Sequence, residues 1–197
     1  MKELGVPVPV AQNTDSWSDQ ELIEAAKKDP EVFGILMARY EKPLKRYLMR
    51  LTGWGEEEIV DILQESFIKA YRALNDYDRD LKFSSWIYRI THNQAIDTIR
   101  KERVRPIFSA LPLEEATKIL SSEGDIGKTL EIQEDSARVQ KAIANLPLQY
   151  REVLILRFLE DRSYEEIMDI LKKPKGSVAT LIRRGRALLL KKLESIE

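Results

Sequence analysis

Apolar residues recur every three or four positions along most of the chain, which is the spacing of one buried face on an α-helix. This pattern predicts helices over residues 18–28, 30–53, 56–78, 83–103, 135–146, 147–161, 163–171 and 176–196. Between 106 and 133 the periodicity is lost among prolines, glycines, serines and acids, a composition typical of a linker. The pattern therefore predicts an all-α fold with two small helical domains joined by a flexible linker.

The domain boundaries follow from the same pattern. Residues 1–16 hold prolines and polar residues without helical periodicity, so we expect a disordered N-terminal extension there. The first helical domain is expected over 17–105 and the second over 134–197, with the linker at 106–133 between them.

Charge is distributed unevenly along a chain whose formal net charge is only −1. Residues 172–193 contain eight cations and no acid, and residues 82–105 contain six cations against two acids. Residues 114–135 contain seven acids against two lysines. Two basic segments separated by an acidic one suggest two contacts with a polyanion. For either segment alone, a solvated helix face is an alternative interpretation.

The C-terminal domain carries a helix-turn-helix pattern. Ser163 and Glu166 have capping-box spacing at the start of a short helix, and the turn "KKPKG" separates that helix from a cationic one. Such a second helix can enter the major groove, where its early residues face bases and its arginines reach phosphates. A basic pair of surface helices without DNA binding is the alternative.

The helix predicted at 83–103 combines aromatic residues with a polar edge. Phe83, Trp86 and Ile87 share one face at 100° per residue, and we expect Trp86 and Tyr88 to pack in the core. Packing does not explain the polar edge beside them, which includes Arg89, His92, Asn93 and Arg100.

Several functional classes are disfavoured by composition. The chain has no cysteine and a single histidine, His92, so thiolate and multi-histidine zinc sites are excluded, and no glycine-rich phosphate loop is present. We therefore predict no enzyme activity, catalytic residue, metal site or cofactor. Without a signal peptide pattern or an apolar run of about eighteen residues, we expect no membrane insertion and a cytoplasmic location.

Two segments of the chain resemble a known family. Residues 61–101, "DILQESFIKAYRALNDYDRDLKFSSWIYRITHNQAIDTIRK", resemble the second conserved region of bacterial sigma factors, and residues 146–189 resemble the fourth. The absence of a first region and the short joining segment are typical of the extracytoplasmic-function type. The resemblance implies an alternative sigma factor that binds core RNA polymerase, recognises the −10 and −35 promoter elements and helps to open promoter DNA.

The resemblance also implies three sets of contact residues and a further partner. Core polymerase would be bound by Asp61, Ile62, Leu63, Gln64 and Glu65. The −10 DNA would be contacted by Asn75, Asp76, Tyr77, Arg79, Lys82, Arg89, His92, Asn93, Asp97 and Arg100. The −35 DNA would be contacted by Lys175, Ser177, Thr180, Arg183, Arg184 and Arg186. Most members of the family are held by an anti-sigma protein, which the resemblance implies as a partner here.

The recognition helix departs from the family pattern. Where the family commonly shows a Thr-Val-Lys-Ser-Arg run, residues 177–181 read "SVATL", and Gly185 replaces a small helix former. A stand-alone helix-turn-helix regulator with an N-terminal partner-binding domain remains the alternative function. The "DILQES" helix and the basic aromatic helix favour the sigma factor, because such a regulator has no need for a strand-opening helix.

Overall fold

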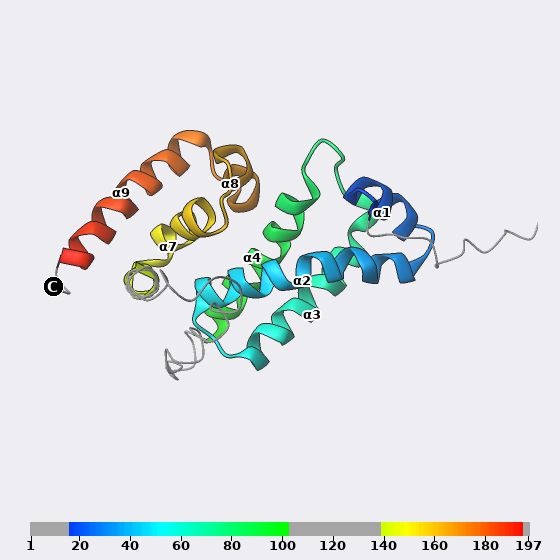
Figure 1. The fold of residues 1–197 in the computed structure, drawn as a ribbon, viewed down its shortest axis with the longest axis horizontal. Helices are drawn as coiled ribbons and strands as arrows, with labels where there is room; N and C mark the ends of the chain where they lie inside the picture. The colour runs from blue at the N-terminus through cyan, green and yellow to red at the C-terminus, as the bar shows by residue number, and fades with distance from the viewer. Residues whose placement is uncertain (1–15, 103–138, 195–197) are drawn as a thin grey trace, which may run out of the picture.

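The computed structural model describes residues 16–102 and 139–194, and each element within these ranges is helical (Figure 1). The predicted all-α fold is thereby confirmed. The predicted linker at 106–133 lies outside the described residues, as do residues 1–15 of the predicted extension.

Four α-helices and a short 3-10 turn form the described N-terminal domain. The elements are α1 (Asp19–Ala26), α2 (Pro30–Thr52), α3 (Glu56–Arg72), η2 (Leu74–Asp76) and α4 (Phe83–Glu102). The helix predicted to run to residue 78 ends earlier, because the chain turns through η2 before α4.

Local sequence sets the ends of the first two helices. The Glu21 backbone N–H donates to Ser18 Oγ at 3.3 Å, and the Ser18 backbone N–H donates to Glu21 Oε2 at 2.7 Å, so the capping box closes on α1. Helix α2 starts at Pro30, whose missing N–H needs no partner there, and ends at Gly53. Gly53 has φ +74°, a left-handed conformation that glycine adopts without a Cβ clash.

Aromatic side chains anchor α4 in the N-terminal core. The Phe83 and Trp86 ring centroids lie 5.4 Å apart, and Tyr77 from the preceding loop lies 5.5 Å and 5.3 Å from these two rings. Trp86 is 6% exposed and Tyr88 is fully buried. The expectation that Trp86 and Tyr88 pack in the core is therefore confirmed.

The described part of the C-terminal domain begins with a helical segment at 139–144. It then contains α7 (Leu148–Leu154), the π-type turn η3 (Ile155–Leu159), α8 (Tyr164–Leu171) and α9 (Lys175–Glu194). Sequence periodicity predicted one uniform helix over 147–161, whereas the backbone widens into a π turn from Ile155 onward.

Gly185 marks the contact between α9 and α7. A Cβ at Gly185 would lie 3.2 Å from Leu154 Cγ and within 3.4 Å of both Leu154 δ carbons, which is closer than comfortable packing allows. The departure from the family pattern at Gly185 is thus matched by a close helix–helix approach.

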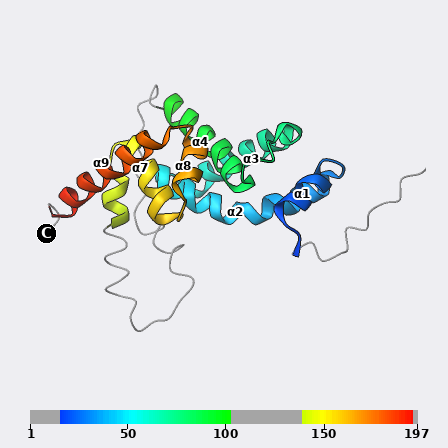
Figure 2. The same ribbon diagram turned by 90° about the horizontal axis from the view of Figure 1, so that it is seen from above.

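The two domains pack directly on each other. Helix α8 lies beside α4, η3 meets α2, and α9 lies on the outer side of the C-terminal domain (Figures 1 and 2). Lys82 Nζ lies 3.4 Å from Glu166 Oε1, and Arg50 Nη1 lies 2.7 Å from Glu160 Oε1. The C-terminal domain therefore covers part of α4.

Candidate nucleic-acid and polymerase interfaces

Helix α8, the turn after it and α9 form a helix-turn-helix. The Ser163 N–H donates to Glu166 Oε2 at 2.9 Å and the Glu166 N–H donates to Ser163 Oγ at 3.2 Å, so the second capping box is also formed. Helix α8 ends at Lys172, which has φ 51°. These local signals set the short turn that orients α9.

One face of α9 is buried and the opposite face is exposed and cationic. Val178, Ile182 and Gly185 point inward. Of the predicted −35 residues, Thr180 is half-buried, and the exposed ones are Lys175, Ser177, Arg183, Arg184 and Arg186. The arrangement leaves a polar and basic helix face available to a groove of DNA.

Acidic and aromatic neighbours hold two of these cations. Lys175 Nζ lies 3.9 Å from Glu165 Oε1, and the Arg186 guanidinium lies 5.9 Å from the centre of the Phe158 ring. Both contacts are exposed, so each is weak enough to be exchanged for a phosphate.

Helix α3 presents a mixed polar and apolar face. Among the residues predicted to bind polymerase, Asp61, Gln64 and Glu65 are exposed, whereas Ile62 and Leu63 are buried in the core. The two buried side chains therefore position the helix, and the three exposed ones are available to a partner.

Three exposed apolar residues adjoin this polar set, and the sequence analysis missed them. Val60, Ile68 and Tyr71 are 37%, 50% and 44% exposed. With Gln64 they recur every three or four residues, so they follow one stripe of α3. This second apolar stripe is visible in the sequence and could have predicted an interaction surface, because a helix needs only one apolar face to pack in the core.

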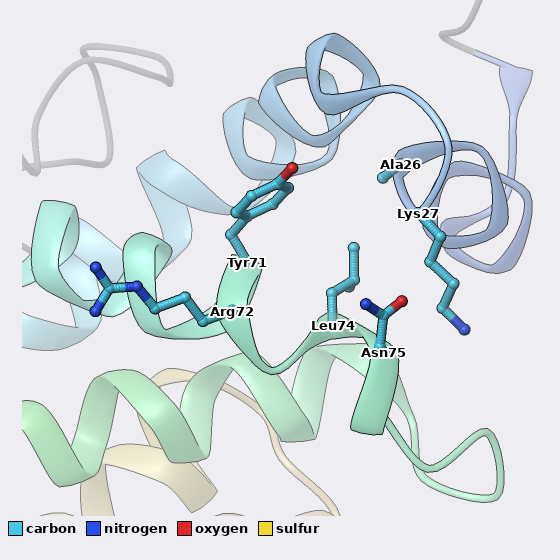
Figure 3. Close-up of a pocket in the computed structure, with 6 residues that line it drawn as sticks. All are labelled: Ala26, Lys27, Tyr71, Arg72, Leu74 and Asn75. Carbon is cyan, nitrogen blue, oxygen red and sulfur yellow. The ribbon is translucent and has the colours of Figure 1, made fainter.

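A small pocket lies beside Asn75, one of the residues predicted to contact the −10 element. It has a volume of about 220 Å³, and Tyr71, Leu74 and Asn75 line one side of it, with Ala26 and Lys27 on the other (Figure 3). Arg72 completes the lining. The pocket thus combines an aromatic ring, an apolar side chain and an amide, whereas the Arg72 side chain points away from them (Figure 3).

The predicted −10 residues divide into exposed and buried groups. The exposed side chains are Asn75, Asp76, Arg79, Lys82, Asn93, Asp97 and Arg100, and Arg89 is half-buried. Tyr77 packs under Phe83 and Trp86, and His92 is 5% exposed beneath the C-terminal domain. In this arrangement Tyr77 and His92 are not available for contact with DNA, whereas the exposed side chains are.

A buried polar cluster surrounds His92. Tyr47 Oη lies 2.7 Å from Nδ1 of His92, and Nε2 lies 3.4 Å from Glu152 Oε2 of α7. Lys173 Nζ donates to the other Glu152 oxygen at 2.8 Å. Burial raises the pKa of Glu152, but hydrogen bonds from His92 and Lys173 outweigh burial, so this pKa lies below its ordinary value. Glu152 is therefore held as a carboxylate between the domains.

A second buried cluster surrounds Glu160. Its carboxylate accepts hydrogen bonds from Arg50 Nη1 at 2.7 Å and from the Tyr88 hydroxyl at 2.9 Å. The Arg162 guanidinium lies 4.2 Å from the centre of the Tyr88 ring. Burial and the nearby Glu160 carboxylate raise the pKa of Tyr88 to about 12, so the hydroxyl stays protonated and donates.

The fold and these surfaces define a class of protein. Two helical domains, an exposed helix-turn-helix and a second polar and basic helix edge are the features of a DNA-binding transcription protein. Among the described helices, none combines the length and apolar content that crossing a bilayer requires.

Comparison with known proteins identifies the family within this class. The model of sigma-70 region 2 matches residues 36–105, and that of sigma-70 region 4 matches residues 136–189. The chain is 33% identical over 180 residues to the ECF RNA polymerase sigma factor SigW of Bacillus subtilis, covering 88% of this chain and 95% of that protein. It is 32% identical over 189 residues to the sigma-E factor of Escherichia coli, covering 93% of this chain and 98% of that protein.

Solved structures agree with this assignment. CnrH, solved in complex with the cytosolic domain of CnrY, superposes with a TM-score of 0.66 at 26% identity, covering 91% of this chain and 99% of that chain. The sigma factor RpoE of Bartonella quintana shares the fold, with a TM-score of 0.61 at 19% identity over 82% of this chain and 96% of that chain. The chain belongs to the ECF sigma factors of RNA polymerase, as the sequence resemblance predicted. Two regions in this order favour this family over a stand-alone regulator.

Proposed function

We propose that this protein is an alternative sigma factor in which α3 binds core RNA polymerase, α4 with its preceding loop contacts the −10 element, and α9 contacts the −35 element. The observation that carries the proposal is the match to both sigma regions, each containing an exposed helix face suited to its task. The protein acts as an initiation factor rather than as an enzyme. We further propose that it acts in the cytoplasm, where polymerase and promoter DNA are found.

The proposed polymerase contact is the exposed face of α3. It combines the exposed apolar residues Ile68 and Tyr71 with the polar residues Asp61, Gln64 and Glu65 beside them. Apolar side chains ringed by polar ones are typical of protein interfaces, in which the apolar part supplies affinity and the polar part supplies specificity. Ile62 and Leu63 contribute by fixing the orientation of the helix.

Substitutions on this face test the polymerase contact. Asp61→Arg combined with Gln64→Ala should weaken co-purification with core polymerase at least about tenfold, because it reverses one charge and removes one amide on the proposed contact. A tenfold loss of affinity corresponds to about 1.4 kcal/mol. The matched control is Glu41→Arg, an exposed charge reversal on α2. Equal retention of both variants, with unchanged helical circular dichroism, would reject the proposed contact.

The proposed −10 surface uses exposed groups around the loop before α4. Lys82, Asn93 and Arg100 provide donors for phosphates and bases. The pocket beside Asn75 has room and chemistry for an unstacked base, since Tyr71 offers a ring and Asn75 an amide. Tyr77 supports the loop through its contacts with Phe83 and Trp86. His92 is buried against Glu152 of the C-terminal domain, so it would contact DNA only if the two domains separated.

The proposed −35 surface is the outer face of α9. Ser177 and Thr180 lie near its N-terminus and three residues apart, so both can reach base edges. Arg183, Arg184 and Arg186 lie farther along the helix, where they reach further bases or phosphates, and Lys175 is suited to a phosphate contact.

We also propose an anti-sigma protein as a regulatory partner and two domains at 17–105 and 134–197 joined by the segment 106–133. CnrH was solved with the cytosolic domain of CnrY bound, which supports the idea that a second protein can hold a chain of this fold. The two separate family matches support the domain division.

Run-off transcription tests the whole proposal. Core polymerase and a randomised promoter library are incubated with and without this chain, and the transcripts are sequenced. Initiation from a defined promoter motif only when the chain is present is the expected result. A transcript population that does not change when the chain is added would refute the proposed function.

A further inference from the structure

Helix α1 carries a carboxylate that reaches the proposed −10 surface. The match to sigma-70 region 2 begins at residue 36, so α1 precedes it in the chain. Glu24 of α1 nevertheless pairs with Arg79 in the loop before α4, and Glu24 Oε1 lies 2.6 Å from Arg79 Nη2. Arg79 is one of the residues predicted to contact the −10 element, so a cation of this surface faces an anionic group of α1.

The same oxygen of Glu24 holds a second cation. Lys27 Nζ donates to Glu24 Oε1 at 3.1 Å, and Lys27 lines the pocket that includes Asn75 (Figure 3). The hydrogen bond from Lys27 lowers the pKa of Glu24, and the charge of Arg79 lowers it further, so Glu24 is a carboxylate at neutral pH. One carboxylate thus pairs with two cations near the end of α1.

The position of Glu24 is fixed by the packing of α1 on α2. The buried side chains of α1 are Leu22, Ile23 and Ala26. Arg39 of α2 donates from Nη1 to Asp19 Oδ1 at 2.6 Å and from Nη2 to the Trp17 carbonyl oxygen at 2.9 Å. Because these bonds hold the start of α1 and the core holds its length, Glu24 projects from a rigid element.

Without a carboxylate partner, Arg79 and Lys27 would attract DNA of any sequence. Every nucleotide carries the same phosphate, so a cation that binds it adds affinity but no sequence information. Discrimination comes from base contacts, which Tyr71 and Asn75 offer at the pocket. A carboxylate that occupies both cations subtracts a constant amount from the affinity for every sequence, so a site is filled only where its bases add enough. The pair is exposed and therefore weak, so it reduces this attraction without abolishing it.

We propose that Glu24 sets the stringency of −10 recognition by restraining Arg79 and Lys27, which weakens the attraction of this surface for the DNA backbone. Glu24 acts through the two cations and not on DNA itself, so it is a positioning residue. The inference rests on the proposed function, because it takes the loop before α4 as part of the −10 surface. The Arg79 side chain is 59% exposed, so DNA reaches it in the free protein without a rearrangement of the fold.

Binding of single-stranded DNA to the full chain tests the restraint. The probe is a fluorescein-labelled, mixed-sequence strand of about 16 nucleotides, and its anisotropy is measured over a series of salt concentrations. Glu24→Gln keeps the size of the side chain and removes its charge. Its dissociation constant at low salt should fall about three- to tenfold, because each freed cation no longer gives up an exposed ion pair to bind a phosphate. The dependence of log K on log salt should steepen by about 0.7 for each cation that reaches a phosphate.

Two controls separate this restraint from a simple change in net charge. Glu41→Gln, at an exposed position of α2, changes the net charge equally and should alter the affinity less than about twofold. In a background that carries Arg79→Gln and Lys27→Gln, Glu24→Gln should have no larger effect than Glu41→Gln. Circular dichroism verifies that all variants are folded.

Three results of this binding experiment would reject the inference. One is an affinity that Glu24→Gln leaves unchanged. Another is equal tightening by Glu24→Gln and Glu41→Gln, which would show that only net charge matters. The third is undiminished tightening by Glu24→Gln in the background that lacks both cations.

A promoter assay tests the stringency itself. Run-off transcription compares the cognate promoter found by library selection with versions that carry one −10 mismatch, at a polymerase concentration that nearly saturates the cognate promoter. Glu24→Gln should raise transcription from the mismatched promoters about three- to tenfold, by the same factor as its gain in affinity, and from the filled cognate promoter less than about twofold. An unchanged ratio between mismatched and cognate promoters would reject the inference. A wild-type chain that supports no promoter-dependent transcription would instead reject the proposed function, whereas the strand-binding experiment needs no polymerase and is independent of that result.

Discussion

Replacing Gly185 with valine tests the close approach of α9 to α7. The first carbon of any side chain at Gly185 would lie 3.2 Å from Leu154 Cγ, and Leu154 is itself fully buried. Valine adds two further methyl groups at the same place, so either α9 must move outward or Leu154 must leave its rotamer.

The expected change in stability combines two opposing effects. Overpacking a well-packed contact costs about 1–3 kcal/mol. Valine is a better helix former than glycine by about 0.4 kcal/mol, which offsets a small part of that cost. The net destabilisation is about 0.6–2.6 kcal/mol, and each kcal/mol lowers the Tm of a domain of this size by about 4–8 °C. We therefore expect the C-terminal domain to melt about 2–20 °C lower.

The tryptophans allow the two domains to be followed separately. All three tryptophans (Trp17, Trp54 and Trp86) belong to the N-terminal domain, whereas far-ultraviolet circular dichroism reports helices of both domains. In the Gly185→Val variant, part of the circular dichroism signal should be lost at lower temperature. The tryptophan fluorescence transition should shift less, because the N-terminal core is unchanged.

A double-mutant cycle then identifies the contact. Leu154→Ala alone should cost about 2–5 kcal/mol by leaving a cavity. In the double variant, valine fills part of that cavity, so the two changes should couple by about 0.5–3 kcal/mol. An unchanged Tm for Gly185→Val would refute this account of the helix contact. Additive effects in the double variant would refute it as well.

Three further predictions concern DNA recognition, pH and the segment between the domains. Lys175→Ala should reduce transcription from all cognate promoters alike, whereas Thr180→Ala should change base preference at one or two −35 positions by about 1–3 kcal/mol; selection from a randomised −35 library distinguishes them. Because the pKa of Glu152 is depressed in the folded protein, its contribution to stability is present above the ordinary value of 4.5 and lost as pH falls through the folded pKa. Urea unfolding at several pH values should therefore show that the free energy of unfolding falls less steeply toward acid pH for Glu152→Gln than for the wild type. Limited proteolysis of the free protein should cut first within 106–133, and protection there equal to that of the helices would contradict the proposed domain division.

Features that depend on neighbouring residues could be predicted from the sequence. Both capping boxes, the proline start of α2 and its glycine end depend on contacts within a few residues, and the structure contains all of them. The buried stripe of α9 follows from helical periodicity, which places Val178 and Ile182 on one face. The same local patterns carried the family resemblance that the comparisons confirmed.

Features that depend on distant residues could not be predicted in this way. Periodicity shows that His92 lies on a polar edge of α4, but not that Glu152, sixty positions later, covers it. Likewise, Gly185 looks like a poor helix former until Leu154 is seen against it. Helical geometry is set by hydrogen bonds between residues three to five apart, so the sequence by itself determined where the helices lie, their caps and the family. It did not show the end of α3 at Arg72 or the π turn from Ile155. The packing of one domain on the other depends on side chains that meet only in space, and tertiary structure alone decided which residues of α4 are exposed.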